Sequence, residues 1–481
     1  MDTLIGFLTS TSWLYWSLVT IYGITILSVI GVILSENRNP VKSLAWVTVL
    51  LLFPAVGLVL YIFFGRNLKS THIISRRNKR KLKRNERGMN IDYNNIALSR
   101  ESKQQILLAH TLCGASYYQG NNVGIFTSGK EKFDALEQDL RNAQSYIHLQ
   151  YYIFEDDKTG HRIRDILMER AAAGVRVRVI YDHVGSFKAK QRFYKEMQDA
   201  GVMVHPFFRV AFPPFGTRIN WRNHRKICII DGKTGYIGGM NIADRYIKGV
   251  TYGIWRDTHL RITGPAISAL QYSFAVDWSF MGQPLPDEEL ELSGAPNSDN
   301  AGMQMVTSGP TSQWNNIALV FLKAIANAKK SILIQTPYFL PTESLLKALQ
   351  SAALSKVDVR IMIPLRSDSS MLRYASFSYI RECLRAGIKI YLYEAGMLHS
   401  KSIVIDDEFS TVGSTNFDFR SFEHNFECNM LIYSTEVNAR MREIFAHDLK
   451  SCSRINATKW EKRPYTEKAK ESIIRLLSPI L

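Results

Sequence analysis

Cysteine is scarce in this sequence, and no two cysteines have the spacing of a metal or redox motif. Five are scattered over 481 residues: Cys113, Cys228, Cys383, Cys428 and Cys452. Their odd number and wide separation argue against a disulfide framework and against a cysteine-based zinc site. The histidines show no metal-ligand spacing either, so we expect neither a metal nor another cofactor.

Acidic residues are also fewer than basic residues. The chain has 43 Asp and Glu against 60 Lys and Arg, a formal net charge of +17. This balance favours an anionic partner, such as nucleic acid, phospholipid or phosphate esters. Hydrophobic residues make up 46% and aromatic residues 11%, which excludes intrinsic disorder, collagen and coiled coil as the main description. The length predicts two or three domains.

Charge is absent from two long segments near the N-terminus. No charged residue occurs from Thr3 to Ser35 or from Ser43 to Gly65. The first segment holds enough apolar residues for a helix of about 30 Å, the thickness of a bilayer core. It lacks the basic start and the small-residue cleavage site of a signal peptide, and it lacks the polar stripe of a core helix. We therefore predict two antiparallel transmembrane helices in the cell membrane.

A basic run follows the second apolar segment. Ten Lys or Arg residues and one acid, Glu86, lie between Arg66 and Arg87. The positive-inside rule places this run, and everything after it, on the cytoplasmic side. A nucleic-acid site is the alternative, but a basic run beside a membrane span favours anionic lipids as partners, with no nucleic acid.

The remaining chain contains a repeat of strands and helices. Gln150–Phe154, a helical segment and the strand Val175–Tyr181 recur as Gln335–Phe339, another helical segment and the strand Val357–Ile363. This order predicts parallel βαβ layers with helices on both faces of a sheet. The predicted divisions are a hairpin over 1–65, a basic linker over 66–104, a first half over 105–285, a linker over 286–309, a second half over 310–465 and a C-terminal helix over 466–481.

One motif, H-x-K-x4-D, stands at the same place in both halves. Its positions are His224, Lys226 and Asp231 in the first copy and His399, Lys401 and Asp406 in the second. Each copy is followed by G-x-x-N, which places Asn241 and Asn416 ten residues after the motif aspartates. A single copy carries little weight, but two copies in register within a repeated frame are not a plausible accident.

The spacing of the motif points to phosphate chemistry. Residues i and i+2 of a strand face the same way, so each histidine shares a face with its lysine. If the halves pack about a pseudo-two-fold axis, two imidazoles, two ammonium groups and two asparagine amides surround one anion. One neutral imidazole can attack phosphorus while the other gives a proton to the leaving oxygen. Lysine and amide donors stabilise the charge without a metal.

Each histidine also needs a carboxylate that fixes its tautomer. Asp257 and Glu427 open strand-like segments after the two asparagines and are our candidates for this role. Asp231 and Asp406, although grouped here with the catalytic residues, stand at strand ends, where an aspartate braces neighbouring backbone.

The paired motifs resemble those of the phospholipase D superfamily, and further segments resemble its bacterial cardiolipin synthase branch. These segments are Arg38-Asn-Pro40, Pro54-Ala-Val-Gly57, Asp277-Trp278, Asp418-Phe-Arg420-Ser421 and Leu476-Leu-Ser-Pro479. The resemblance implies an α/β fold with two tandem phospholipase D-like halves about a pseudo-two-fold axis, preceded by a two-helix transmembrane hairpin.

The resemblance also implies a reaction. A phosphatidyl group passes from one phosphatidylglycerol to the hydroxyl of another, glycerol is released, and a phosphohistidine forms on the way. We assign the phosphohistidine to His224 and proton transfer to His399, although the symmetry of the motifs leaves the reverse open. Lys226, Lys401, Asn241 and Asn416 would hold the phosphate oxygens. A phospholipase D-type hydrolase, another phosphatidyltransferase, a nuclease and a non-catalytic scaffold are the alternatives.

Overall fold

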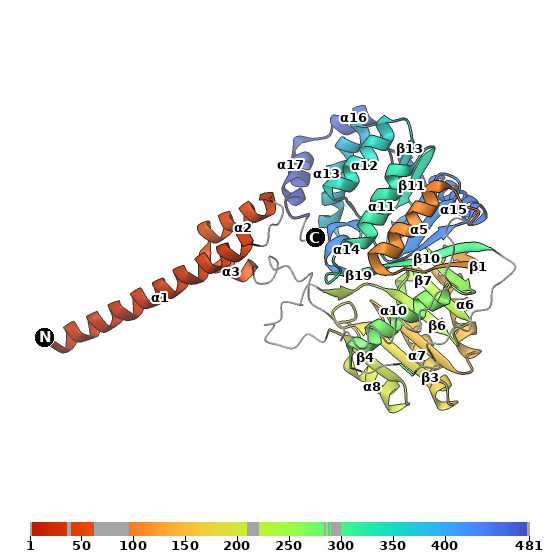
Figure 1. Ribbon diagram of the computed structural model, residues 1–481, viewed down its shortest axis with the longest axis horizontal. Helices are drawn as coiled ribbons and strands as arrows, with labels where there is room; N and C mark the ends of the chain where they lie inside the picture. Colours follow the sequence, from red (N-terminus) through yellow and green to blue (C-terminus); the bar gives the residue numbers. More distant parts are fainter. Residues whose placement is uncertain are drawn as a thin grey trace. The chain divides into compact units, whose positions relative to one another are not determined.

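The computed structural model describes residues 2–35, 40–61, 96–208, 221–282, 285–286, 289 and 300–478. The chain divides into two compact units, a helical unit near the N-terminus and a larger α/β unit (Figure 1). The basic run 66–87 lies outside the described residues, as do residues 287–288 and 290–299 of the predicted linker 286–309.

The helical unit contains α1 (Asp2–Ser35), α2 (Pro40–Leu52) and α3 (Pro54–Leu60). Ile26 and Ile33 of α1 share a small apolar core with Leu50 of α2. Within the second charge-free run, 43–65, the helix breaks between Leu52 and Pro54, and residues 62–65 lie outside the described ranges. None of the helices in the described ranges combines the length and the apolarity that crossing a membrane requires.

Pro54 explains the break. Proline lacks an N–H group and restricts the residue before it, and Phe53 accordingly has an extended φ of −132°. The chain then folds back, since the rings of Trp46 and Tyr61 lie 5.4 Å apart. A Cβ atom on Gly57 would lie 2.8 Å from the carbonyl oxygen of Val49, so only glycine allows α3 to pack this closely on α2.

The α/β unit is built on a continuous sheet of 16 strands. The first half supplies β1 (Tyr117–Phe126), β2 (Tyr146–Tyr151), β3 (Arg176–Asp182), β4 (Met203–Phe207), β6 (Lys226–Ile230), β7 (Thr234–Gly238) and β9 (His259–Thr263). The second half supplies β10 (Ala301–Ser308), β11 (Ser331–Gln335), β13 (Asp358–Pro364), β14 (Lys389–Tyr393), β16 (Ser402–Ile405), β17 (Phe409–Gly413), β19 (Asn425–Tyr433) and the short β20 (Cys452–Arg454). The remaining strand, β5 (Arg222–Asn223), pairs with β19.

The strand order repeats around the middle of the sheet. The order β1-β9-β7-β6-β2-β3-β4 on one side mirrors β10-β19-β17-β16-β11-β13-β14 on the other. The two halves join where β1 pairs antiparallel with its counterpart β10, which is the pairing that a two-fold relation between equivalent strands requires. The tandem α/β organisation is thus confirmed.

The sheet is mixed, which corrects the expectation of purely parallel layers. In each half three strands run parallel, β2-β3-β4 and β11-β13-β14. The motif strands β6 and β16 instead pair antiparallel with β2 and β11. The motif strands also pair antiparallel with the strands that follow them, β7 and β17, because short turns and not crossover helices connect them.

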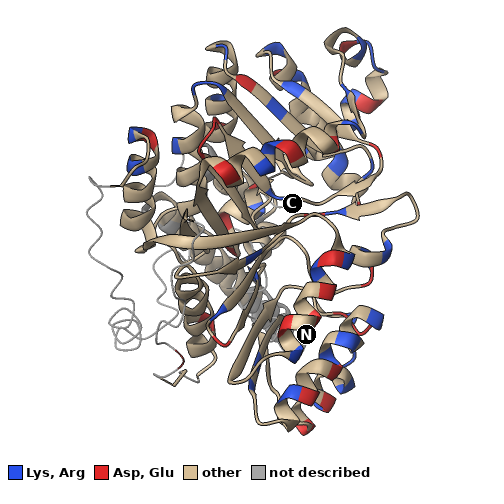
Figure 2. Cartoon of the chain, turned by 90° about the vertical axis from the view of Figure 1, so that its right-hand side faces the viewer, with Lys and Arg blue, Asp and Glu red and all other residues tan. Residues whose placement is uncertain are grey.

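Helices cover both faces of the sheet. Along β2, alternate side chains contact helices on opposite faces. Ile147, Leu149 and Tyr151 join the core formed with α6 (Gly129–Arg141) and α7 (Lys158–Ala172). The alternate residues His148 and Gln150 bond to Gln271 and Asp277 of α10 (Ile267–Phe280) on the opposite face. Basic and acidic residues are interspersed along the peripheral helices, and the strands between them carry few charges (Figure 2).

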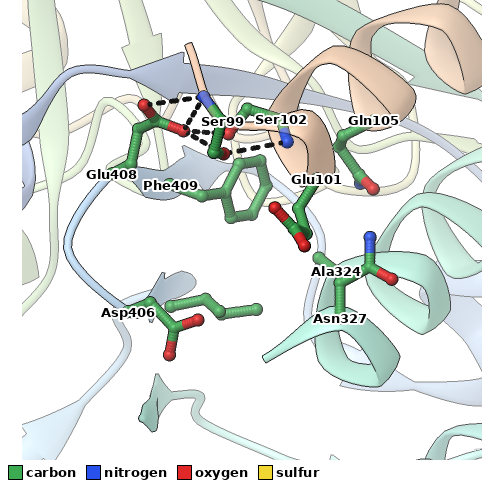
Figure 3. A pocket seen from close by; sticks show the side chains of 10 residues that line it. Ser99, Glu101, Ser102, Gln105, Ala324, Asn327, Asp406, Glu408 and Phe409 are labelled. Atoms are coloured by element: carbon green, nitrogen blue, oxygen red, sulfur yellow. Dashed lines mark hydrogen bonds between the residues drawn. The ribbon is translucent and has the colours of Figure 1, made fainter. Parts of the chain in front are cut away.

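Helix α5 (Arg100–Cys113) ties the start of the described α/β unit to the second half. Ser99 caps this helix by accepting a hydrogen bond from the N–H of Ser102. Glu408 accepts hydrogen bonds from the hydroxyl groups of both serines beside a small cavity (Figure 3). Asp406, at the end of the second motif, also lines this cavity, whereas the motif histidines line a different one.

Candidate active site

The histidines of the two motifs precede β6 and β16 and are docked on the opposite half of the fold. The N–H of His224 donates to the carbonyl of Phe426 at 2.9 Å, and the N–H of His399 donates to that of Arg256 at 2.7 Å. Each motif strand therefore begins where the chain contacts the other half, and both imidazoles reach one cavity of about 260 Å³.

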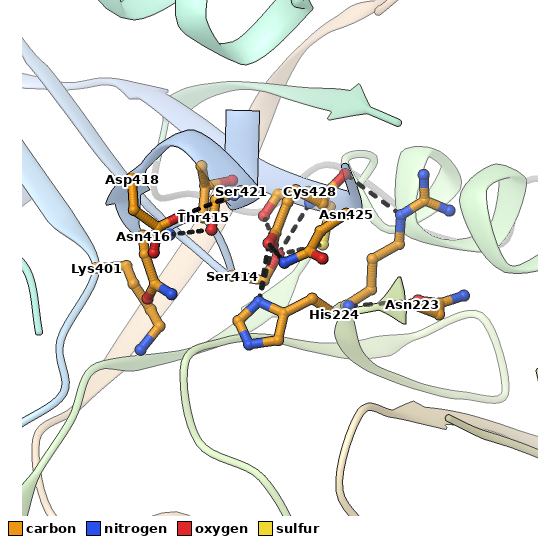
Figure 4. A network of polar contacts seen from close by, with 12 residues as sticks. Asn223, His224, Lys401, Ser414, Thr415, Asn416, Asp418, Ser421, Asn425 and Cys428 are labelled. Carbon is orange, nitrogen blue, oxygen red and sulfur yellow. Dashed lines mark hydrogen bonds and ion pairs between the residues drawn. The ribbon is translucent and has the colours of Figure 1, made fainter. Parts of the chain in front are cut away.

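The orienting carboxylates are exchanged between the halves. Figure 4 shows the imidazole of His224 with Ser414 and Asn425 of the second half nearby. Nδ1 of His224 lies 2.9 Å from a carboxylate oxygen of Glu427, which also belongs to the second half. Nδ1 of His399 lies 2.6 Å from a carboxylate oxygen of Asp257, which belongs to the first half. Both carboxylates are completely buried. In each imidazole Nδ1 therefore carries the proton toward the carboxylate, and Nε2 is left as the reactive atom.

The G-x-x-N segments make room for these carboxylates in two different ways. A Cβ atom on Gly239 would lie 2.1 Å from Oδ1 of Asp257, so glycine is required there for the close approach. Ser414 occupies the equivalent position in the second half and donates its hydroxyl to Glu427. Asn425 donates to the same carboxylate at 3.2 Å.

The two motif lysines are almost fully buried. Each ammonium group donates to the carbonyl of its own motif histidine, two residues earlier. Burial lowers the pKa of Lys226 to about 7 and that of Lys401 to about 8. A phosphate bound nearby would favour the charged form of both lysines, because an opposite charge raises the pKa of an ammonium group.

Burial also lowers the pKa of both histidines to about 4, with Glu427 and Asp257 opposing the effect. The carboxyl group of Glu427 resists ionisation because it is buried, but His224 and Lys226 beside it bring its pKa below the ordinary value. The resting site therefore holds neutral imidazoles beside an ionised carboxylate. A neutral imidazole is the form that can attack phosphorus.

The two asparagines line the cavity, but their amides are partly used by the protein. Oδ1 of Asn241 accepts from the N–H of Ile153 at 3.1 Å, and its Nδ2 donates to the hydroxyl of Tyr246 at 2.6 Å. The Oδ1 atom of Asn416 has no hydrogen-bond partner within the described residues. Asn241 thus fixes the cavity wall as well as facing the cavity.

The motif aspartates lie elsewhere, at the far ends of their strands. Asp231 accepts hydrogen bonds from the backbone N–H groups of residues 144–146, at 2.8 to 2.9 Å. Asp406 accepts from those of residues 329–331, at 2.7 to 2.9 Å. Both have positive φ angles, 52° and 49°. They hold the loops before β2 and β11, which is the bracing role expected of an aspartate at a strand end.

The motif search missed several cavity residues. The ring of Tyr152 lies 4.8 Å from that of His224, and the ring of Trp255 lies 5.1 Å from that of His399. Tyr338 and Asp368 also line the cavity. Position was a usable signal for Tyr152, Tyr338 and Trp255, because each stands near the end of a strand that borders a motif or an orienting carboxylate. Asp368 follows β13, which pairs with β11 and β14 and borders neither. Within the described ranges, no three His, Cys, Asp or Glu side chains are grouped as metal ligands.

Comparisons with known proteins agree with this geometry. The family model described as "Cardiolipin synthase, PLD-like domain" matches residues 136–268 and 321–449. A second model, "Phospholipase_D-nuclease N-terminal", matches residues 23–66. Among solved structures, phosphatidylserine synthase from Haemophilus influenzae is similar in fold, with a TM-score of 0.62 at 17% identity over 80% of this chain and 100% of that one.

Curated relatives are similar over nearly the whole chain. The major cardiolipin synthase ClsA of Bacillus subtilis is 41% identical over 475 residues, which cover 95% of this chain and 97% of that protein. A cardiolipin synthase of Halalkalibacterium halodurans is 40% identical over 99% of this chain and 96% of its own length. Together with two motif copies that meet in one cavity, these matches show that the chain belongs to the phospholipase D-like cardiolipin synthase family.

Proposed function

We propose that this protein is a cardiolipin synthase that transfers a phosphatidyl group from one phosphatidylglycerol to the hydroxyl of another and releases glycerol. The observation that carries the proposal is the pair of imidazoles in one cavity, each oriented by a carboxylate of the opposite half. Such a pair supplies a nucleophile and a separate acid-base group, which transfer between two alcohols requires.

In the first step His224 acts as the nucleophile. Its Nε2 attacks phosphorus, the bond from phosphorus to the glycerol oxygen breaks, and the electron pair goes to that oxygen. His399 gives the oxygen a proton from its own Nε2. The phosphate charge raises the proton affinity of His399 when substrate binds, because an opposite charge favours the protonated form.

In the second step the hydroxyl of another phosphatidylglycerol replaces the glycerol. His399 takes the proton from this hydroxyl, the new bond from oxygen to phosphorus forms, and the bond to His224 breaks. Lys226 and Lys401 stabilise the charge on the phosphate oxygens, with Asn241 and Asn416 at the cavity wall. Glu427 stabilises the positive imidazole ring of the phosphohistidine.

We further propose that the N-terminal helical unit anchors the enzyme in the cell membrane, with the α/β unit on the cytoplasmic side. The charge-free run 3–35 and the basic run 66–87 support this orientation. Phosphatidylglycerol lies in the membrane plane, and basic residues near an anionic surface concentrate its head groups.

The test is product analysis with purified full-length protein and phosphatidylglycerol vesicles. We expect cardiolipin and free glycerol in equal amounts, and loss of both products in His224→Ala and His399→Ala. Phosphatidic acid as the main product would identify a hydrolase instead. Absence of any product from the wild-type protein would refute the proposed donor.

A further inference from the structure

The cavity contains an acidic group that phosphate binding does not explain. Asp368, in the segment between β13 and α13 (Ser370–Arg385), lines the cavity at its exposed rim. A carboxylate repels a phosphate, so its place beside the motif histidines calls for another ligand group. A carboxylate accepts hydrogen bonds, and the donors in phosphatidylglycerol are the hydroxyl groups of its glycerol.

Asp368 is held in position by a buried neighbour. The hydroxyl of Tyr338 donates to the two carboxylate oxygens of Asp368, at 2.7 and 3.0 Å. Tyr338 is only 9% exposed and lines the same cavity. The hydroxyl of Ser367 also donates to one of these oxygens, at 3.2 Å. Two carboxylate oxygens have about four acceptor positions, so the two donors leave room for hydroxyl groups of a ligand.

The pair exists on only one side of the pseudo-two-fold axis. Gln150 and Gln335 occupy equivalent positions on β2 and β11, and three residues later stand Ile153 and Tyr338. Ile153 has an aliphatic side chain and cannot donate to a carboxylate as Tyr338 does. The described first-half residues that line the cavity include no Asp or Glu. The first half therefore offers no comparable acceptor at this place.

The asymmetric pair belongs to the side of His399. Burial lowers the pKa of His399, and the charge of Asp368 is among those that oppose this effect. The same charge acts on Lys401. The rim position of Asp368 also suits a group that must leave to water, as free glycerol does.

We propose that Asp368 and Tyr338 form the subsite for the glycerol hydroxyl groups of phosphatidylglycerol, on the side of His399. This inference rests on the proposed function and deepens it. Asp368 accepts a hydrogen bond from the hydroxyl next to the reacting oxygen, while His399 exchanges a proton with the reacting oxygen itself. Glycerol thus leaves, and the accepting hydroxyl enters, at His399, and attack on phosphorus falls to His224.

The experiment measures exchange of deuterated glycerol into phosphatidylglycerol by the full-length enzyme, which is the first step followed by its reverse. Asp368→Asn and Tyr338→Phe are compared with Glu408→Gln, a change at a carboxylate that accepts serine hydroxyl groups beside α5 and does not line this cavity. We expect Asp368→Asn to raise the KM for glycerol about tenfold or more, with kcat changed less than twofold. Tyr338→Phe should raise KM less, and Glu408→Gln should leave it within about twofold.

Three results would overturn the inference. The first is an unchanged KM for glycerol in Asp368→Asn. The second is a loss of kcat without any change in KM. The third is equal competition of ethanolamine with glycerol in the wild type, which would make Asp368 a site for ammonium head groups. Failure of the proposed function is distinguishable, because the wild-type protein would then incorporate no glycerol at all.

Discussion

The contact between Glu427 of the second half and His224 of the first predicts a loss of activity in Glu427→Gln. Glu427 is fully buried and accepts hydrogen bonds from His224, Ser414 and Asn425. Glutamine has the same size, but its NH2 group must face one of these three donors. The substitution also removes the negative charge that stabilises a positive ring at His224.

The expected loss follows from the hydrogen bond to His224. A hydrogen bond to a charged group is worth about 1.5–3 kcal/mol, which corresponds to a decrease in kcat of about 10- to 150-fold. Ser414→Ala keeps the charge of Glu427 and removes one neutral donor worth about 1 kcal/mol, so it should cost about fivefold. Glu427→Gln should therefore lower kcat more than Ser414→Ala does.

The assay is the rate of cardiolipin formation from phosphatidylglycerol vesicles, with Tm measured in parallel. Glu408→Gln serves as the matched control. Glu408 also accepts hydrogen bonds from serine hydroxyl groups, but it lies at the start of α5 and does not line the cavity of the motif histidines. Its kcat per folded molecule should equal that of the wild type. The reasoning is refuted if Glu427→Gln keeps kcat within threefold of the wild type at an unchanged Tm.

Three further predictions concern other parts of the site. Because burial lowers the pKa of Lys226 and Lys401 to about 7 and 8, kcat/KM should fall as pH rises through this range, and a profile that stays flat to pH 9 would contradict the assignment. Asp231→Ala leaves three backbone N–H groups without their acceptor, so urea denaturation should show a loss of about 2–4 kcal/mol in stability, with kcat per folded molecule retained. Gly239→Ala places a methyl group against Asp257 and should lower kcat at least tenfold, whereas wild-type kinetics would show that the carboxylate can move aside.

The repeat was enough to predict that the two motif histidines meet. Two copies of one motif in equivalent halves are brought together when the halves pack about a pseudo-two-fold axis. The structure accordingly places His224 and His399 in a single cavity. The tandem α/β halves could be predicted for the same reason, since the order of strands and helices recurs in the sequence.

The sequence could not predict that each motif histidine contacts the carboxylate of the opposite half. Asp257 and Glu427 were chosen because each follows an asparagine of its own half, and sequence order says nothing about which histidine each contacts. The contact is decided by the docking of the halves, where His224 bonds to the backbone beside Glu427 and His399 to the backbone beside Asp257. Only the assembled fold contains this information.

The remaining differences have local physical causes. The charge-free run 43–65 contains Pro54, which lacks the N–H that a continuous helix needs, and the chain folds back at Phe53. Asp368 escaped notice because it has no counterpart in the first half, and a search for repeated positions finds only what the halves share. Motif membership was likewise a poor guide to the role of Asp231, whose partners are backbone groups.

The stereochemical course at phosphorus tests the central claim most directly. Phosphatidylglycerol that carries a single sulfur at phosphorus, in one configuration, is converted by the wild-type enzyme, and the configuration of the product is determined by phosphorus NMR. Two successive displacements, onto His224 and then onto the accepting hydroxyl, predict net retention. Net inversion would show that the hydroxyl attacks directly, and it would contradict the phosphohistidine account.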